Sequence, residues 1–491
     1  MMRQLTALDA QFLHAESPTT TAHVAGVAIV DPARAPSGAI TARTLAALLR
    51  RRIHLAPALR MRLAEVPFGL DLPYWTEDPG FDPAEHVYET TLPAPELLTD
   101  VVARIHERRL DRDRPLWEMH LIHGLSGGRV AIYTKVHHCA IDGVSGAEAL
   151  AAVLDLAPEG REPAPAEPAE PVTAPGPLTM LAGAAMRSVT HPVRALDSLR
   201  RTAADLDAVP VAATLPGARW VARAARLLGG EPDVPALPPL DVPRTPLTGP
   251  VSGQRRFAYG SLPLAELRRV GRAFGMSVND VVMALCASAL RTWLRERDAL
   301  PERPLIAAVP VGARRRGSGE PGNRISAMAV PIATDVADPL RRLLATKSAM
   351  AAAKRRFASS PATWLSDLST ILPPPVTALA TAPVFRLAGM AFPPINLIVS
   401  NVPGPRFPLY LCGGRVEAYY PMSVVTDLSG GLSVTCFSYD GSLCFGLLAC
   451  PRHVDDVWRL FGHLRAALTE LTALAGPPPV PGERAKVRVP A

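Results

Sequence analysis

Apolar and polar residues alternate along this chain in the pattern of an α/β fold, first within residues 1–157. The apolar runs His23 to Val30 and Arg129 to Val136 predict strands. The helical spacing of apolar positions in Thr41 to Arg52 and in Glu96 to Arg109 predicts helices. A further helix is expected at about Ser145 to Leu156, where small and apolar residues suit packing on a sheet.

The same mixture of elements returns in residues 251–475. Apolar runs predict strands at Leu305 to Val311, Ile325 to Ile332 and Asn396 to Ser400, and helical spacing predicts helices at Leu262 to Phe274, Val278 to Arg297 and His453 to Ala475. Between them, the turn signals Ser429-Gly430-Gly431 and Asp440-Gly441 indicate β-hairpins. Helices mixed with strands in both parts of the chain indicate two α/β sandwiches of related build.

The segment between these parts, residues 158–250, has a different composition. Pro158 to Pro177 is a Pro/Ala/Glu tract that cannot build a core, so we expect a disordered connector there; Glu231 to Pro250 is also Pro-rich. Leu178 to Leu228 has helical periodicity and carries mostly arginine as its charge. Two interpretations stay open: the helices lie on an anionic lipid surface, or they pack on the protein with their arginines in water. A Pro-rich, flexible tail is expected at residues 476–491.

Composition narrows the classes of protein. Hydrophobic residues make up 48% of the 491 residues, which predicts a folded chain with a large apolar interior. The net charge of +7 is spread out and forms no basic and aromatic array, so we expect no nucleic-acid partner. No apolar run is long enough to span a bilayer and no secretory signal is visible. The six cysteines have no CxxC spacing and suit buried free thiols in a reducing compartment. A cytoplasmic protein with at most peripheral membrane contact is expected.

The most informative motif is His137-His138-Cys139-Ala140-Ile141-Asp142-Gly143, which has the form HHxxxDG and follows a predicted strand. Histidine can take and return a proton near neutral pH, so the motif is suited to general acid–base chemistry. Neighbouring strand residues point to opposite faces. One imidazole is therefore expected to act as the base while the other packs or orients it.

Two other uses of the motif are disfavoured. A zinc site from its histidines, Cys139 and Asp142 would need adjacent ligands that diverge on an extended chain, and no second ligand cluster is present. A Cys139 nucleophile would need a base placed against it, and its chain neighbour His138 is poorly placed for that. No metal is expected.

Six short elements follow one another along the chain: Leu8 to Leu13 followed by His23-Val24, Pro115-Leu116-Trp117-Glu118, the motif His137 to Gly143, Arg255-Arg256-Phe257 after Leu247 to Pro250, Asn279-Asp280, and Ser400 to Pro405. In this order they resemble the bacterial wax ester synthase/diacylglycerol acyltransferase family over nearly the whole chain. The chain departs from the family's pattern at Ala22, Ala25 and Thr248, where the family often has Met, Gly and Asn.

The resemblance implies two chloramphenicol acetyltransferase-like, condensation-domain-like α/β sandwich domains with the active site in a channel between them. Residues 1–157 would be the N-terminal acyltransferase domain and residues 251–475 the acyltransferase-like second domain. The implied reaction transfers a fatty acyl group from acyl-CoA, as co-substrate, to diacylglycerol or a long-chain alcohol. It implies no bound cofactor, and lipid partners at the inner face of a membrane or on lipid droplets.

Within the motif, the resemblance and the chemistry assign the general base to His138, with no acyl-enzyme. His137 is its neighbour in the pair. Asp142 is expected to fix the loop by pairing with an arginine; the alternative is that it orients the imidazole, as in a catalytic triad. Gly143 is expected to allow a backbone angle or a close approach closed to other residues.

The second half supplies four supporting candidates. Asn279, beside Asp280, is a candidate donor to the oxyanion or to the imidazole, and it is equally a candidate cap for a helix starting near Val281. Ser400 and Asn401 precede two prolines around a glycine, which indicates a rigid turn first and a place at the channel mouth second.

Two alternative functions remain. One is a condensation-type acyl transfer in the synthesis of a complex lipid or peptide, because HHxxxDG also occurs in those related folds. The other is a non-catalytic protein that coats lipid droplets through its basic helices, against which the intact motif argues.

Overall fold

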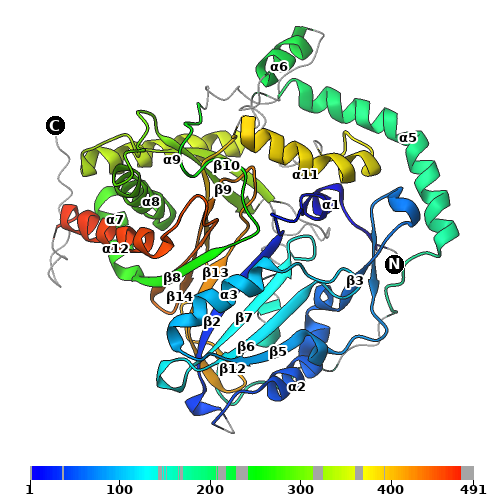
Figure 1. Ribbon diagram of the computed structural model, residues 1–491, viewed down its shortest axis with the longest axis horizontal. Helices are drawn as coiled ribbons and strands as arrows, with labels where there is room; N and C mark the ends of the chain where they lie inside the picture. Colours follow the sequence, from blue (N-terminus) through cyan, green and yellow to red (C-terminus); the bar gives the residue numbers. More distant parts are fainter. Residues whose placement is uncertain are drawn as a thin grey trace.

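The structure is a computed structural model, which describes residues 3–35, 38–141, 146, 149–150, 152–163, 165, 170–205, 207, 217–227, 241–312, 325–359, 369–391 and 393–476. Within these residues, two six-stranded sheets and one small three-stranded sheet are flanked by helices (Figure 1). The α/β architecture predicted from the sequence is confirmed.

The first six-stranded sheet has the order β12-β13-β2-β7-β6-β5. Its central strands are the two predicted from the apolar runs, β2 (His23–Asp31) and β7 (Val130–His137), which pair antiparallel with His23 opposite His137. The remaining strands are β5 (Val87–Thr91), β6 (Trp117–His123), β12 (Tyr410–Leu411) and β13 (Gly414–Met422). Since β7 is central, its C-terminal end is held on both sides by neighbouring strands.

The helices of the first part match the periodicity. They are α2 (Ala42–Arg52) and α3 (Leu98–Glu107), whose buried leucines and valines join the core of the first sheet. The small sheet has the order β1 (Arg3–Gln4), β4 (Tyr74–Glu77) and β3 (Met61–Ala64). Helix α1 (Ala7–His14) follows β1, and the Thr6 hydroxyl caps it by accepting from the Asp9 amide at 3.0 Å.

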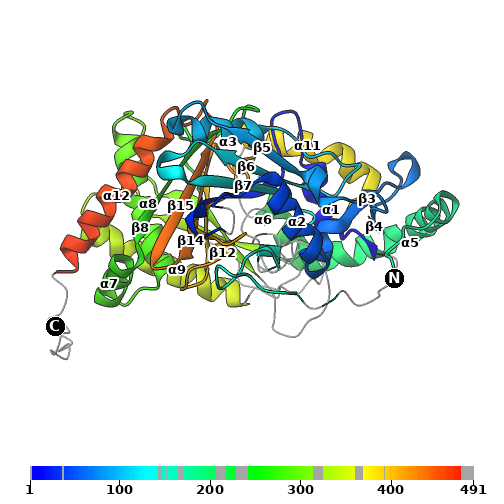
Figure 2. The ribbon, with the colours of Figure 1, turned by 90° about the horizontal axis from the view of Figure 1, so that it is seen from below.

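The second six-stranded sheet has the order β10-β9-β11-β14-β15-β8. Its strands are β8 (Arg256–Pro263), β9 (Leu305–Gly312), β10 (Ile325–Ile332), β11 (Leu397–Val402), β14 (Leu432–Tyr439) and β15 (Ser442–Ala449). The helices α7 (Leu264–Phe274), α8 (Val278–Arg295), α9 (Pro339–Ser359) and α12 (Val457–Leu474) cover one face (Figure 2). The nearly all-apolar α8 is buried among them, which explains its composition.

Strand β13 joins the two sheets, because it belongs to the first sheet although it comes from the second half of the chain. It also lies against β14 and β15, and the ring of its Tyr420 is 4.5 Å from that of Tyr259. A Cβ at Gly26 would lie 2.1 Å from the Tyr419 hydroxyl, so glycine is needed in β2 where this tyrosine crosses it. The domain boundaries drawn from the sequence stay a prediction, and the strand exchange shows that the first sheet draws on residues from both sides of them.

One of the two predicted hairpins is wrong. Asp440-Gly441 does join β14 to β15, with Tyr439 opposite Ser442. At Ser429-Gly430-Gly431, however, the preceding strand β13 pairs with β2 in the other sheet. Gly430 has a φ of +75° there, and a Cβ would meet the Asn396 carbonyl oxygen at 2.3 Å. The glycines therefore permit a close crossing of chain segments and not a hairpin turn.

The connector contains the expected helices, α5 (Pro177–Ala203) and α6 (Ala218–Leu227). The preceding Pro-rich tract is not disordered at its end: the Val172 carbonyl accepts from the Glu77 amide at 2.8 Å, and the Ala174 amide donates to the Thr76 hydroxyl at 3.4 Å. Backbone groups of β4 that would otherwise lack a partner fix this segment. Much of the second Pro-rich stretch and residues 477–491 lie outside the described residues.

Several further expectations can be compared with the structure. All six cysteines are free thiols, and each is buried except Cys412, which is half-buried. Most of the helix expected at Ser145 to Leu156 lies outside the described residues, although Gly146 and residues 149–150 and 152–153 are helical. Helix α9 and helix α11 (Pro374–Ala391) are additional to the predicted elements. Among the described helices, none is long and apolar enough to cross a bilayer alone; α7 and α8 meet that criterion only as a pair bent by 98°.

Candidate active site

The end of β7 presents the histidine pair beside the start of β2. The His138 amide donates to the Ala22 carbonyl at 2.8 Å, and the Ala140 amide donates to the His137 carbonyl at 3.0 Å. The chain therefore leaves the strand in a tight turn immediately after the pair. This turn fixes the backbone of both histidines before either side chain makes a contact.

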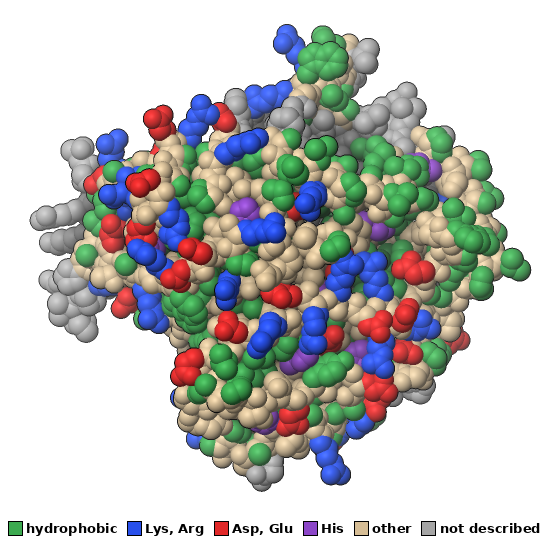
Figure 3. Space-filling model, in the orientation of Figure 1, with side chains coloured by type: hydrophobic (Ala, Val, Ile, Leu, Met, Phe, Trp, Pro, Cys, Tyr) green, Lys and Arg blue, Asp and Glu red, His purple; other side chains and the backbone are tan. Residues whose placement is uncertain are grey.

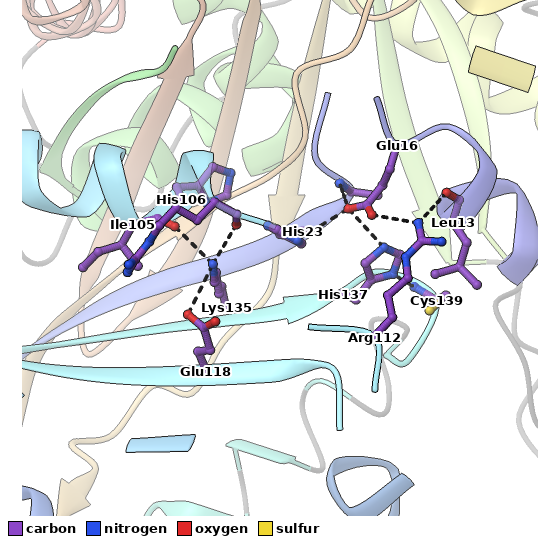
Figure 4. A network of polar contacts seen from close by, with 12 residues as sticks. Leu13, Glu16, His23, Ile105, His106, Arg112, Glu118, Lys135, His137 and Cys139 are labelled. Atoms are coloured by element: carbon purple, nitrogen blue, oxygen red, sulfur yellow. Dashed lines mark hydrogen bonds and ion pairs between the residues drawn. The ribbon is translucent and has the colours of Figure 1, made fainter. Parts of the chain in front are cut away.

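His137 is enclosed, with 1% of its surface exposed. Its Nδ1 accepts from the Cys139 amide at 3.1 Å, so the ring proton is on Nε2. That Nε2 lies 3.4 Å from the Glu16 carboxylate (Figure 4). Nδ1 is thus hydrogen-bonded to the turn, while Nε2 is buried and faces the Glu16 carboxylate.

Glu16 is the centre of this polar network. Its Oε1 lies 3.6 Å from Nε2 of His23 and accepts from the Ala22 amide at 3.2 Å, while its Oε2 accepts from Arg112 at 2.9 Å. Burial raises the pKa of Glu16, but its contacts with His137 and Arg112 outweigh burial and hold the pKa well below its usual range. The carboxylate is therefore ionised throughout the physiological pH range.

A second buried cluster of polar groups is centred on Lys135 of β7. The amine of Lys135 is fully enclosed, donates to the carbonyls of Ile105 at 3.1 Å and Arg108 at 2.8 Å, and lies 3.3 Å from the Glu118 carboxylate (Figure 4). Burial lowers the pKa of Lys135. The lysine satisfies the last carbonyls of α3, which ties this helix to the sheet.

His23 and His106 lie between the two clusters, with ring centroids 6.0 Å apart. Burial, followed by the positive charge of Lys135, lowers the pKa of His23 well below its usual value. Burial, followed by the charges of Arg255 and Lys135, lowers the pKa of His106 to about 3. Both rings are therefore neutral at physiological pH, which avoids a fixed positive charge beside His137.

His138 differs from its neighbour because its side chain is only half-buried. Its ring stacks on Phe12 of α1, with the ring centroids 4.2 Å apart and the planes 3° from parallel. A stacked aromatic restricts rotation of the imidazole without occupying its in-plane nitrogens. Of the two histidines in the motif, His138 is thus the more exposed.

Cys139 has no suitable environment for a nucleophile. It is buried, and burial, followed by the negative charges of Asp9 and Glu16, raises the pKa of its thiol well above its usual value. In the described part of the chain, no group of three or more His, Cys, Asp or Glu side chains is placed to hold a metal ion. Asp142 and Gly143 lie outside the described residues.

The predicted cap at Asn279 is wrong. Helix α8 begins at Val278, and Ser277 caps it in a capping box with Asp280: the Asp280 amide donates to Ser277 Oγ at 3.3 Å and the Ser277 amide donates to the Asp280 carboxylate at 2.9 Å. Asp280 also pairs with Lys354 of α9 at 2.6 Å. Asp280 therefore has a structural role, and Asn279 is half-buried in the first turn of α8, among the helices of the second sheet.

Ser400 and Asn401 lie in β11, which pairs parallel with β14, opposite Thr435 and Cys436. The turn expected at these two residues starts after Val402. A Cβ at Gly404 would lie 2.2 Å from the Ser438 carbonyl oxygen, so the glycine allows the turn to press against β14. The structure does not join these residues to the first sheet, which holds the histidine pair.

Arg255 connects the second half of the chain to the site. It lies in one of the elements that carry the family resemblance. Its buried guanidinium donates to the carbonyls of Thr19 at 2.8 Å and Val425 at 3.2 Å. Thr19 lies just before Ala22, whose carbonyl holds His138. The arginine thus connects the start of the second half to the loop that positions the motif.

Glu16, Phe12 and Arg112 were not predicted from the sequence as site residues. Phe12 lies within the quoted element Leu8 to Leu13, so its position was visible but its role was not. An acidic residue shortly after that element, in a segment that the fold buries, is the only signal of Glu16. The pairing of β2 with β7 brings these residues close to the histidines, although the two strands are far apart in the sequence.

Family models cover most of the chain. Residues 5–282 match the wax ester synthase/diacylglycerol acyltransferase catalytic domain, and residues 321–472 match the WS/DGAT C-terminal domain. A putative diacylglycerol O-acyltransferase of Mycobacterium tuberculosis is 35% identical over 481 residues, covering 96% of this chain and 100% of that protein. A probable diacylglycerol O-acyltransferase of the same species is 34% identical, covering 95% of this chain and 98% of that protein.

Solved structures agree with these matches. The wax ester synthase/diacylglycerol acyltransferase from Marinobacter aquaeolei superposes with a TM-score of 0.68 at 30% identity, covering 96% of this chain and 100% of that one. The starter condensation domain of rhizomide synthetase superposes with a TM-score of 0.51 at 14% identity, covering 97% and 95% of the two chains. The second likeness shows a shared fold alone.

Proposed function

Because the chain belongs to the wax ester synthase/diacylglycerol acyltransferase family, we propose that it transfers a fatty acyl group from acyl-CoA to the hydroxyl of diacylglycerol or of a long-chain alcohol. The products are a triacylglycerol or a wax ester, and free CoA. The observation that carries this proposal is the difference in burial between the two histidines. His137 is enclosed, whereas His138 is half-buried and stacks on Phe12.

His138 acts as the general base. An alcohol attacks a thioester slowly until its proton leaves, and a neutral imidazole within hydrogen-bond reach takes that proton as the oxygen attacks. The new C–O bond forms, the carbonyl becomes an oxyanion, and the C–S bond then breaks. The departing thiolate receives the proton from the imidazolium, so atoms and charge balance without an acyl-enzyme.

His137 and Glu16 act on this base through the backbone. The ionised Glu16 carboxylate lies against Nε2 of His137, and Nδ1 of His137 accepts from the Cys139 amide, so the His137 ring lies between Glu16 and the turn that carries His138. Within the same proposal, Asp142 and Gly143 shape the remainder of that turn. Asn279 is the proposed donor to the oxyanion from the second half, and Ser400 and Asn401 are proposed to lie at the channel mouth.

The substrates require a lipid surface, so we also propose peripheral association with the inner face of a membrane or with lipid droplets. Helix α6 supports this, because Trp220 and Leu227 are exposed beside Arg223. In the preceding helix α5, Met186 and Val189 are exposed, whereas Arg187 is held against the protein by the carboxylate of Asp71. The connector thus exposes apolar side chains to water, while the ion pair of Arg187 with Asp71 holds it against the rest of the protein.

The experiment is an acyl-transfer assay with purified protein. Labelled palmitoyl-CoA is offered with diolein and, in parallel, with hexadecanol, and both labelled lipid product and free thiol are measured. Acyl transfer predicts equal amounts of product and CoA with at least one acceptor. Droplet or vesicle binding without product from either acceptor would contradict the enzyme and support a coat protein. Thiol release without lipid product would contradict transfer to an alcohol.

A further inference from the structure

Helix α11 exposes its apolar side and buries a side with threonines, the reverse of an ordinary surface helix. Its buried side includes Thr377, Thr381 and Gly389, while its aliphatic side chains face outward. Leu379 is 80% exposed and Leu387 is 66% exposed. A surface helix of a water-soluble fold normally buries its apolar stripe. The arrangement therefore leaves an apolar face without a covering element in the described part of the chain.

This outward face, called here the α11 face, is nearly continuous. Its large side chains follow helical spacing along one side, and they are Val376, Leu379, Val384, Leu387 and Met390, with Leu372 just before the helix. Figure 3 shows hydrophobic side chains gathered over this part of the molecule. The only charged residue in Pro374–Ala391 is Arg386, which is exposed.

The helix cannot turn over to hide this face, because polar contacts hold its inner side. The Thr381 hydroxyl lies 3.2 Å from the amide oxygen of Gln11 in α1 and donates to the Thr377 carbonyl at 2.7 Å. A Cβ at Gly389 would meet the Asp427 carbonyl oxygen at 2.1 Å, so the backbone packs directly against that loop. Arg244 donates to the Ala391 carbonyl at 2.9 Å and closes the end of the helix.

The inner side of α11 leads to the reacting histidine. Helix α11 packs on α1, where Gln11 receives the contact from Thr381 (Figure 1). The next residue of α1, Phe12, stacks on His138. Helix α1 therefore lies between the inner side of α11 and the proposed base, and the α11 face is the opposite side of the same helix.

From this placement we infer that the α11 face is the surface by which the protein lies on an anionic phospholipid layer, next to the site where the lipid alcohol reacts. The inference rests on the proposed function for the identity of that alcohol. The face offers aliphatic side chains and a single cation with no anion, which complements an acyl layer under negative headgroups. Apart from Arg386, the large exposed side chains of this face are aliphatic, whereas the centre of a protein interface is enriched in aromatic side chains.

The test is sedimentation of full-length protein with vesicles of phosphatidylcholine and phosphatidylglycerol, without acyl donor. The double variant Leu379→Gln/Leu387→Gln is compared with Leu340→Gln/Leu344→Gln, which changes two exposed leucines four residues apart on α9. Because the two leucines would pass from water into lipid on binding, the α11 variant is expected to bind at least ~10-fold more weakly. The α9 variant is expected to bind like the wild type.

A third variant tests the charge. Arg386→Glu is expected to lose the preference for vesicles with phosphatidylglycerol over vesicles of phosphatidylcholine alone. Wild-type binding by the α11 double variant would overturn the inference. A dimer in light scattering that this variant abolishes would also overturn it, because a second copy of the chain would then occupy the face. Vesicle binding needs no turnover, so failure here is separate from failure of the acyl-transfer assay.

Discussion

The carboxylate of Glu16 lies 3.4 Å from Nε2 of His137, and this contact braces the turn that carries His138. Replacing Glu16 with Gln keeps the shape and removes the charge. We expect kcat to fall by about 10- to 100-fold, part of the roughly 10²- to 10⁴-fold that a well-placed base contributes. The expected change in KM is small, because Glu16 is enclosed.

Glu77→Gln is the matched control, since Glu77 also pairs with an arginine, Arg60, but lies on the small sheet. Thermal unfolding of each variant is measured alongside the kinetics. A fall in kcat for Glu16→Gln at an unchanged Tm would indicate positioning. Equal kinetics for the two variants would rule out a positioning role for Glu16.

Stacking of Phe12 on His138 gives a second prediction. Phe12→Leu keeps an apolar side chain but removes the flat ring that restricts the imidazole, so kcat is expected to fall about 10-fold, or about 1.4 kcal/mol. Phe12→Tyr keeps the ring and is expected to stay close to the wild type. If the leucine variant is as active as the tyrosine variant, stacking does not position the base.

The buried thiol of Cys139 gives a third prediction. Burial raises the pKa of this thiol, and the proposed reaction has no acyl-enzyme. Cys139→Ala is therefore expected to keep kcat within about threefold of the wild type, a change under ~1 kcal/mol. An acyl group trapped on Cys139 after denaturation in acid, followed by mass spectrometry, would contradict direct transfer.

His106 predicts how stability depends on pH. Burial lowers its pKa in the folded protein to about 3, while an unfolded chain has a histidine pKa of about 6.5. Between these values the unfolded chain binds a proton that the folded chain does not. This group's contribution to stability is thus fully present above pH ~6.5 and is lost as the pH falls toward 3, at up to about 1.4 kcal/mol per pH unit.

Urea unfolding at several pH values between 7 and ~4.5 measures this slope. His106→Gln, which can still bond to Tyr133, is expected to unfold with a shallower dependence on pH. An unchanged slope would mean that His106 is already protonated in the folded protein.

Strands β2 and β7 and the place of the histidine pair at a strand end were predictable, because alternation and motif spacing are local signals. The pairing of β13 with β2 was not predictable. The turn signals near β13 favour pairing with a neighbouring strand, whereas its partner β2 is remote in sequence. The helix α11 was missed because residues 374–391 are small or apolar on nearly every side and include three prolines, which leaves no clear amphipathic period.

The candidate site was also predictable only in part, where local signals sufficed. His138 was assigned from the motif, but its environment comes from α1, and the brace on His137 comes from Glu16 in the loop after that helix. Asn279 was a candidate cap because asparagine caps helices well, yet Ser277 precedes it and forms the capping box with Asp280. Local propensity could not decide between two capping residues that lie two positions apart.

The most direct test compares His138→Ala with His137→Ala in steady-state transfer from palmitoyl-CoA, with Tm measured for both. We predict that His138→Ala lowers kcat by roughly 10²- to 10⁴-fold with little change in Tm, because this ring is half-buried and takes the proton. His137→Ala is predicted to lower Tm, since it opens a buried site beside Glu16. A folded His138→Ala protein that keeps more than about a third of the wild-type rate would contradict the proposed base, because the loss would be under ~1 kcal/mol.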